Sequence, residues 1–151
     1  MFEYDLDAAE INRLMFDTKS RNLLNLERLV LETAEYHFND RCMLLAVTTE
    51  MQRETGCSST ELEGIAVISR SLEGVLAGVT IKQLDETEFK ISLRTYPPLN
   101  AAEICKRLGG GGHVAAAGAT MHGTLAEIKQ QVLSAVSAVM EEADAGTSVI
   151  G

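Results

Sequence analysis

Four consecutive glycines, Gly109 to Gly112, stand directly before His113 in the stretch "KRLGGGGHVAAAGA", residues 106–119. Glycine costs roughly 0.5–1 kcal/mol relative to alanine in regular structure, so such a run is expected only where the backbone needs positive φ or a close neighbour. A titratable ring beside unhindered main-chain N–H groups suits the binding of an anion. This stretch is therefore the first candidate for chemistry.

Three interpretations of the glycine run follow from its neighbours. Its N–H groups would bind an anion at the start of a helical turn over residues 113–117, where free donors and the helix dipole favour negative charge. It would alternatively be a helix C-cap followed by a tight turn, with no ligand. A dinucleotide fingerprint or a nucleotide phosphate loop is disfavoured, because the run follows a predicted helix and no G-K-[ST] sequence occurs.

Arg94 is the second candidate, and it lies near the end of the predicted strand "EFKISLRTY", residues 88–96. Side chains alternate between the two faces of a strand with a period of two. Arg94 therefore stands at the end of a polar face. The alternation predicts one apolar face and one polar face, made respectively of Phe89, Ile91 and Leu93 and of Lys90, Ser92 and Arg94.

Residues for catalysis are not evident in the chain. Its three histidines include none in an H-E-x-x-H motif or a paired His/Asp cluster that would hold a metal. No G-x-S-x-G sequence supplies a nucleophile. The three cysteines are odd in number and lack C-x-x-C spacing, which argues against disulfides and a structural zinc site. The sequence therefore assigns no catalytic residue and no metal ligand.

The elements that position the candidates follow from apolar spacing and turn residues. Residues 75–84 and 88–96 form a β-hairpin, and the following prolines stop the sheet. Asn100 caps the helix that leads into the glycine run. The other predicted elements are a helix over 7–38 that breaks near 16–22, a buried strand at 42–48, helices after Thr48 and over 58–74, a short strand at 119–121, and a helix from Thr124 to about Met140.

Composition limits the class of protein and of ligand. The chain has 151 residues with 46% hydrophobic content, which suits one compact domain or one domain with a helical extension. Its formal net charge of −9 repels long polyanions, so a nucleic-acid ligand would be short. From Lys82 to His113, five basic residues against four acidic ones leave a net charge of +1. The chain has neither an apolar span nor a signal-peptide pattern, so we expect a cytoplasmic protein without membrane contact.

The sequence "ISLRT", followed by "GGGGHVAAAGA", resembles the C-terminal, DHH-associated domain of the DHH phosphoesterase family. The resemblance is strongest to the NrnA-like branch, whose members are oligoribonucleases that also dephosphorylate pAp. It covers approximately residues 40–140, and "EINRLMFDTKSRNLLNLERL" resembles the connector that precedes this domain. It implies an α/β (α+β) fold, with a small mixed β-sheet that contains a β-hairpin, flanked by helices and preceded by a helical connector.

The resemblance also implies a division into parts. Residues 1–39 would be the helical connector and the end of a missing N-terminal catalytic domain, residues 40–141 the DHH-associated substrate-binding domain, and residues 142–151 a flexible tail. In that family the N-terminal DHH domain carries the Asp-His-His motif and further aspartates that hold two manganese ions, which activate water. That motif does not occur here. We therefore expect Mn²⁺ in the missing domain, no cofactor in this chain, and no hydrolysis by this chain alone.

The resemblance implies that this chain carries the residues that bind the substrate, while the missing domain carries those that bind the metal ions. Arg94 and His113, with Gly110, Gly111 and Gly112, would hold the terminal phosphate of a short oligonucleotide or a pAp-like nucleotide. A guanidinium is a planar fork that holds two phosphate oxygens, and glycine admits a ligand without a Cβ clash. The expected partners are these nucleotides and the N-terminal DHH catalytic domain.

Two other functions stay open on the sequence. A glycine-rich relative of this domain lies at the C-terminus of alanyl-tRNA synthetases, where it serves tRNA contact or dimerisation. The chain would then be an RNA-binding or dimerisation module, although the hairpin with "ISLRT" so close before the glycines favours the phosphoesterase branch. The apolar stripe from Leu23 to Leu31 would alternatively drive self-association, because exposed apolar patches usually find a partner.

Overall fold

The computed structural model describes residues 18–150, which form one mixed sheet with helices on both faces. The elements are α2 (Arg21–Glu32), β1 (Glu35–His37), β2 (Cys42–Val47), α3 (Thr49–Thr55), α4 (Ser59–Leu62), α5 (Ile65–Ile68), β3 (Ala77–Gln83), β4 (Glu88–Thr95), α6 (Ala101–Lys106), β5 (Gly111–Gly112), β6 (Ala116–His122) and α7 (Leu125–Ile150). The described strands lie in the order β1-β2-β3-β4-β6-β5. β2 and β3 are parallel, and the other neighbours are antiparallel. This architecture confirms the predicted fold class.

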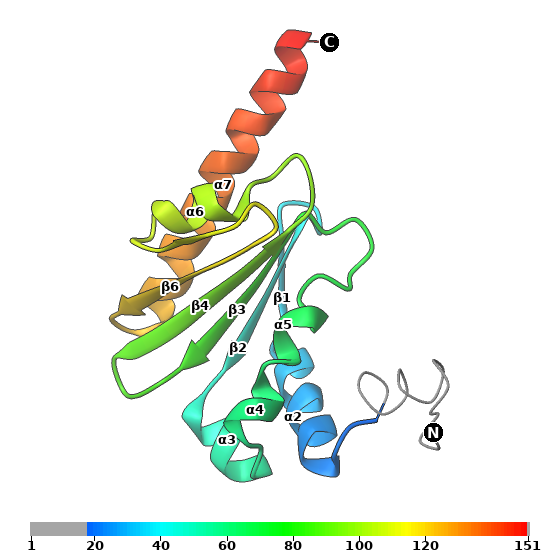
Figure 1. The fold of residues 1–151 in the computed structure, drawn as a ribbon, viewed down its shortest axis with the longest axis vertical. Helices are drawn as coiled ribbons and strands as arrows, with labels where there is room; N and C mark the ends of the chain where they lie inside the picture. Colours follow the sequence, from blue (N-terminus) through cyan, green and yellow to red (C-terminus); the bar gives the residue numbers. More distant parts are fainter. Residues whose placement is uncertain (1–17, 151) are drawn as a thin grey trace, which may run out of the picture.

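Two apolar cores form, one on each face of the sheet. Figure 1 shows the helices that cover the two faces. β2 is buried on both faces, as its continuous apolar run predicts, so Leu44 enters one core and Leu45 the other. The larger core packs all four long strands against α6 and α7. The smaller core packs β2 against α2, α4 and α5, and it takes no described residue from β3, β4 or β6. The same face of β3 and β4 is therefore left for polar side chains.

Helix α2 begins after Ser20, whose Oγ accepts a hydrogen bond from the N–H of Leu23 at 3.0 Å. Its inner face packs on β2 through Leu23, Leu26 and Val30. Much of the apolar stripe that the sequence offered for self-association is thus used within the chain. Leu24 and Leu31 remain exposed, at 53% and 45%. The part of the predicted helix before residue 18 lies outside the described residues.

The predicted hairpin is present as β3 and β4. Its turn is closed by Asp85, whose Oδ1 accepts hydrogen bonds from the N–H groups of Thr87 and Glu88 at 2.9 and 2.8 Å. The alternation in β4 is also as predicted, because its apolar side chains enter the larger core while the polar ones lie on the opposite face. The buried positions are Phe89, Ile91 and Leu93.

The prediction of a helical turn over residues 113–117 is wrong. β6 begins at Ala116 and runs to His122, antiparallel to β4, with Ala116 opposite Arg94. Alanine favours helices, but local propensity is a weak preference that main-chain pairing with β4 overrides here. The predicted strand at 119–121 is correspondingly longer than expected.

The prediction that the last helix ends near residue 140 is wrong, because helix continues through the described part of the segment 142–151, for which the sequence predicted a flexible tail. The final helix α7 continues to Ile150. The extension starts with glutamate and alanine, which favour helix, and ion pairs of 2.7 and 3.4 Å join Glu142 to Arg107 and Asp144 to Arg41. Within residues 18–150 no helix is both long and apolar enough to cross a membrane.

The predicted helix over residues 58–74 is divided into the short helices α4 and α5. The capping box at its start is present, with the Ser58 N–H bonded to Glu61 Oε1 at 3.1 Å and the Glu61 N–H bonded to Ser58 Oγ at 3.3 Å. A turn at Glu63 and Gly64 separates the two helices, and glycine is a poor helix former. The division lets Leu62 and Ile65 both enter the smaller core.

Candidate ligand-binding face of the sheet

The first two glycines of the run end helix α6. Gly109 has φ +85°, and its N–H donates to the carbonyl of Lys106 at 3.2 Å. The N–H of Gly110 donates to the carbonyl of Cys105 at 2.8 Å. These two bonds are the pattern of a Schellman C-cap. The predicted C-cap is therefore present, and binding of an anion at the start of a following helical turn is excluded because β6 follows instead.

The last glycines of the run allow β5 to lie very close to β6. A Cβ on Gly110 would stand 2.1 Å from the carbonyl oxygen of Gly118. A Cβ on Gly112, which has φ +151°, would stand 2.6 Å from Cα of Ala117. A Cβ on Gly111 would meet nothing within 4 Å. Two of the three glycines proposed to face a ligand thus have a packing role, and Gly111 alone of the three faces open space.

The loop that carries His113 is fixed by main-chain hydrogen bonds on two sides. The N–H of His113 donates to the carbonyl of Ala116 at 2.8 Å, which extends the pairing of β5 with β6 by one residue. The carbonyl of Val114 accepts from the Ala101 N–H at 2.7 Å and from Thr95 Oγ1 at 2.9 Å. The His113 side chain is exposed, so its backbone is held while its ring is free to meet a ligand.

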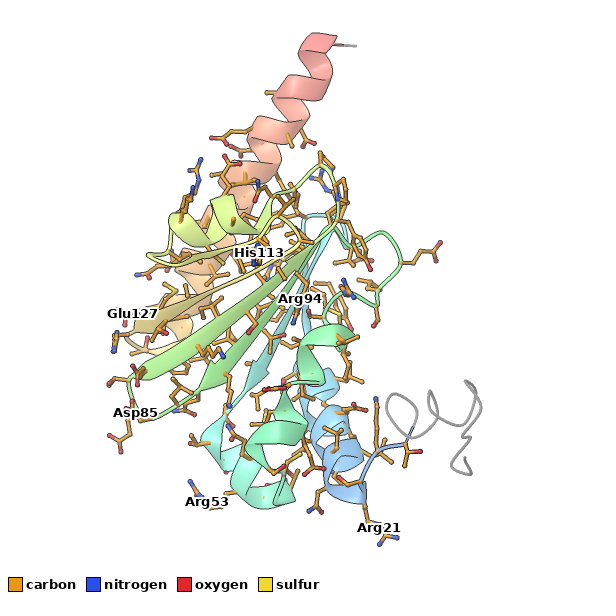
Figure 2. The ribbon with its side chains drawn as sticks, viewed as in Figure 1. Arg21, Arg53, Asp85, Arg94, His113 and Glu127 are labelled. Carbon is orange, nitrogen blue, oxygen red and sulfur yellow. The ribbon has the colours of Figure 1, made fainter. Side chains whose placement is uncertain are left out.

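Arg94 and His113 come from segments far apart in sequence but stand in one row of the sheet. Arg94 pairs with Ala116, and Ala116 in turn pairs with His113. Neighbouring strands lie about 4.8 Å apart, so the two backbone positions are about 10 Å apart. Figure 2 shows both residues toward the end of the sheet at which β4 finishes. An arginine side chain is long enough to bridge most of that separation.

A cavity of about 430 Å³ opens on the polar face of the hairpin, and Arg94 lies at one end of the row of strand residues that line it. Its floor consists of paired positions on β3 and β4, with Thr80 opposite Ser92 and Lys82 opposite Lys90. The remaining lining residues are Val47, Leu62, Glu63 and Ala66. His113 does not line this cavity. Its volume falls in the range of small-molecule sites in proteins, about 300–1,000 Å³.

The cavity has an excess of positive charge. Three cations and one carboxylate line it. None of the side chains of Lys82, Lys90 and Arg94 forms a hydrogen bond or an ion pair with another described residue, whereas other basic residues of the chain do, as in the pair of Lys129 with Glu35 at 2.7 Å. Alternation in β4 predicted Lys90, Ser92 and Arg94 on one face. Thr80 and Lys82 were not assigned to the site, although the same alternation in β3 would have placed them there.

A metal centre does not fit the described residues. They contain no group of three or more His, Cys, Asp or Glu side chains that could hold a metal ion. His37 is bonded to Glu35 of its own strand, at 3.0 Å. Burial raises the pKa of Cys42 to about 12 and that of Cys105 to about 11, so both thiols stay protonated and are poor metal ligands. A pair of manganese ions therefore has no ligand set in residues 18–150.

The family is decided by a match to a protein-family model. The model of the DHHA1 domain matches residues 42–142, from the first residue of β2 into α7. The chain belongs to the DHHA1 domain family. The hairpin, the glycine run and β6 all lie inside this DHHA1 domain, while α2 and β1 precede it. The resemblance predicted from "ISLRT" and the glycine block is thereby confirmed.

Two relatives share most of this DHHA1 chain. It is 34% identical over 135 residues to the bifunctional oligoribonuclease and PAP phosphatase NrnA of Thermus thermophilus, which covers 88% of this chain and 39% of that protein. The crystal structure of an exopolyphosphatase-related protein from Bacteroides fragilis superposes with a TM-score of 0.79 at 26% identity, over 87% of this chain and 39% of the other. This chain therefore spans about two fifths of the length of either relative.

Proposed function

We propose that this DHHA1 domain is the substrate-binding part of a DHH-type phosphoesterase and holds the terminal phosphate of a short oligonucleotide or a pAp-like nucleotide. The observation that carries the proposal is the Arg94 guanidinium, which has no carboxylate partner among the described residues and lines a cavity with excess positive charge. A guanidinium in this state keeps all its donors available for a ligand.

Arg94 and His113 bind different oxygens of the terminal phosphate. The planar guanidinium of Arg94 binds two oxygens side by side, which fixes the orientation of the phosphate. The ring of His113, in the same row of the sheet, donates to a third oxygen or to the neighbouring sugar. Gly111 presents main chain without a side chain beside that position. This arrangement recognises a chain end rather than a continuous polymer.

The relatives support this substrate class. NrnA of Thermus thermophilus is by its name an oligoribonuclease and a PAP phosphatase, so that relative acts on short nucleotides. The formal net charge of −9 on the present chain opposes the approach of long polyanions, which again favours short ligands. We further propose that hydrolysis is performed by a separate N-terminal DHH domain with its Mn²⁺ ions, in the cytoplasm.

Calorimetric titration of the 151-residue chain with 5′-phosphorylated diadenosine tests the proposal. The matched ligand is the same dinucleotide without the 5′-phosphate, which keeps the internal phosphate between the two nucleosides. We expect binding of the phosphorylated ligand, at least tenfold weaker binding of the other, and loss of the difference in Arg94→Ala. Arg53→Ala is the control, because Arg53 is exposed on α3, far from Arg94 in Figure 2, and its side chain also has no partner among the described residues. Equal affinity for both ligands would overturn the proposal.

A further inference from the structure

Two lysines in the cavity are not used by the binding of one terminal phosphate. Lys82 on β3 and Lys90 on β4 stand directly opposite each other. Like charges opposite each other on neighbouring strands destabilise a sheet. Their outer neighbours in register are Val47 and Thr120, which carry no charge. Glu88, two residues before Lys90 on the same strand, forms its ion pair with His122 at 3.3 Å and not with a lysine. An anion between the two ammonium groups would relieve the repulsion.

A buried hydroxyl next to this lysine pair lacks a hydrogen-bond partner among the described residues. Thr80 and Ser92 form the adjacent pair of the hairpin. Thr80 is only 6% exposed, and its Oγ1 has no hydrogen-bond partner among the described residues. A buried hydroxyl without a partner costs free energy. Glu63, the carboxylate that lines the cavity, has no hydrogen bond or ion pair with another described residue, so it does not neutralise the lysines directly.

The lysine pair and Arg94 lie on the same face of the hairpin and line the same cavity. Lys90 and Arg94 are four residues apart on β4, which is about 13 Å along an antiparallel strand. Both side chains are long and lie on the same face. Leu62 and Ala66 give the cavity an apolar side on which a sugar or base can pack. The cavity thus offers cationic groups at two positions along one face and an apolar side next to them.

We propose that Lys82 and Lys90, with Thr80 and Ser92, form a second anion subsite that holds an internal phosphate of a short oligonucleotide. The proposal rests on the proposed function, in which the terminal phosphate of the same ligand lies at Arg94. It adds a preference for chains with at least two phosphate groups over nucleoside monophosphates. The two subsites together select a substrate by the number and spacing of its phosphates.

Calorimetric titration with two ligands separates the subsites. The 151-residue chain and the double variant Lys82→Gln/Lys90→Gln are titrated with 5′-phosphorylated diadenosine, which has a terminal and an internal phosphate, and with adenosine 5′-monophosphate, which has only the terminal one. We expect the double variant to lose at least tenfold in affinity for the dinucleotide and less than twofold for the monophosphate. Lys106→Gln is the matched control, since Lys106 is exposed on α6 without a side-chain partner in the described part.

The salt dependence of dinucleotide binding gives a second readout. A contact to one phosphate of a single strand contributes about 0.7 to the slope of log K against log salt concentration. We expect the double variant to lower that slope by about this amount, and Lys106→Gln to leave it unchanged. Unchanged dinucleotide affinity, or equal losses for both ligands, would overturn the second subsite while leaving the terminal site intact. Failure of the unaltered chain to bind either ligand would instead overturn the proposed function, and the second subsite with it.

Discussion

Arg94 and His113 flank Ala116 in a single row of the sheet, Arg94 on β4 and His113 in the loop that leads into β6. The register thus brings the two backbone positions into one row, although nineteen positions of sequence separate them. In the proposed function both side chains donate to the same terminal phosphate. This geometry makes their contributions to binding depend on each other.

The first prediction concerns this pair. Arg94→Ala and His113→Ala should each weaken binding of 5′-phosphorylated diadenosine by about 1.5–3 kcal/mol, the scale of a hydrogen bond to a charged group. The double variant should lose less than the sum of the single losses, because both residues hold the same phosphate. Calorimetry on the four proteins measures the coupling. Strict additivity would place the two residues at separate groups of the ligand.

The second prediction separates packing from binding within the glycine run. Gly110→Ala should destabilise the domain by about 1–3 kcal/mol, because its Cβ would overlap the carbonyl oxygen of Gly118 at 2.1 Å. Gly111→Ala should leave the free energy of unfolding within about 0.5 kcal/mol of the unaltered chain, because its Cβ meets nothing within 4 Å. Urea denaturation measures both.

The Gly111 variant also reports on the ligand. If the phosphate lies against the main chain at Gly111, Gly111→Ala should weaken phosphate binding while the fold stays intact. Unchanged affinity together with unchanged stability would remove Gly111 from the proposed site. Gly110→Ala cannot give this information, because a loss of binding there would follow from the disturbed packing of β5 on β6.

Sequence reasoning identified the elements that carry the site where local signals were strong. Period-two alternation in "EFKISLRTY" placed Lys90, Ser92 and Arg94 on one face, and Asn100 marked the start of α6, where its side chain accepts from the N–H of Glu103. These features depend on residues close together in the chain. They could therefore be read before any tertiary contact was known.

Errors arose where distant segments decide the structure. Residues 113–117 are alanine-rich and predicted a helical turn, but pairing of Ala116 with Arg94 makes them the start of β6. The crowding of Gly110 against Gly118 depends on the packing of β5 against β6, which no local pattern specifies. The glycines were correctly seen as unusual, while their packing role required the fold.

The third prediction concerns the stability of the domain at low pH. The Glu35 carboxylate accepts hydrogen bonds from Lys129 Nζ at 2.7 Å and from His37 Nε2 at 3.0 Å, which ties β1 to α7. The bond from Lys129, opposed by partial burial and aided by His37, lowers the pKa of Glu35 below its ordinary value of 4.5. A lowered pKa in the folded state means that the stabilisation is present above pH 4.5 and is lost as the pH falls through the folded value.

Glu35→Gln should therefore lower the free energy of unfolding at pH 7 by about 0.2–1 kcal/mol, a small amount because the pair is partly exposed. The difference from the unaltered chain should shrink as the pH falls below 4.5. Urea denaturation at pH 7 and at pH 3.5 measures it, with the exposed Glu141→Gln on α7 as the control. A difference of equal size at both pH values would show that Glu35 acts through packing rather than through its charge.

The fourth prediction is that the 151-residue chain binds short phosphorylated nucleotides without hydrolysing them. Residues 18–150 provide no cluster of metal ligands, and Arg94 and His113 offer donors for a phosphate but no group placed to activate water. Incubation with 5′-phosphorylated diadenosine and Mn²⁺, followed by chromatography of the products, should show no turnover above buffer. Turnover that co-purifies with the chain and falls in Arg94→Ala would reveal a metal site outside the described residues, and would move Arg94 from substrate binding alone into a complete active site.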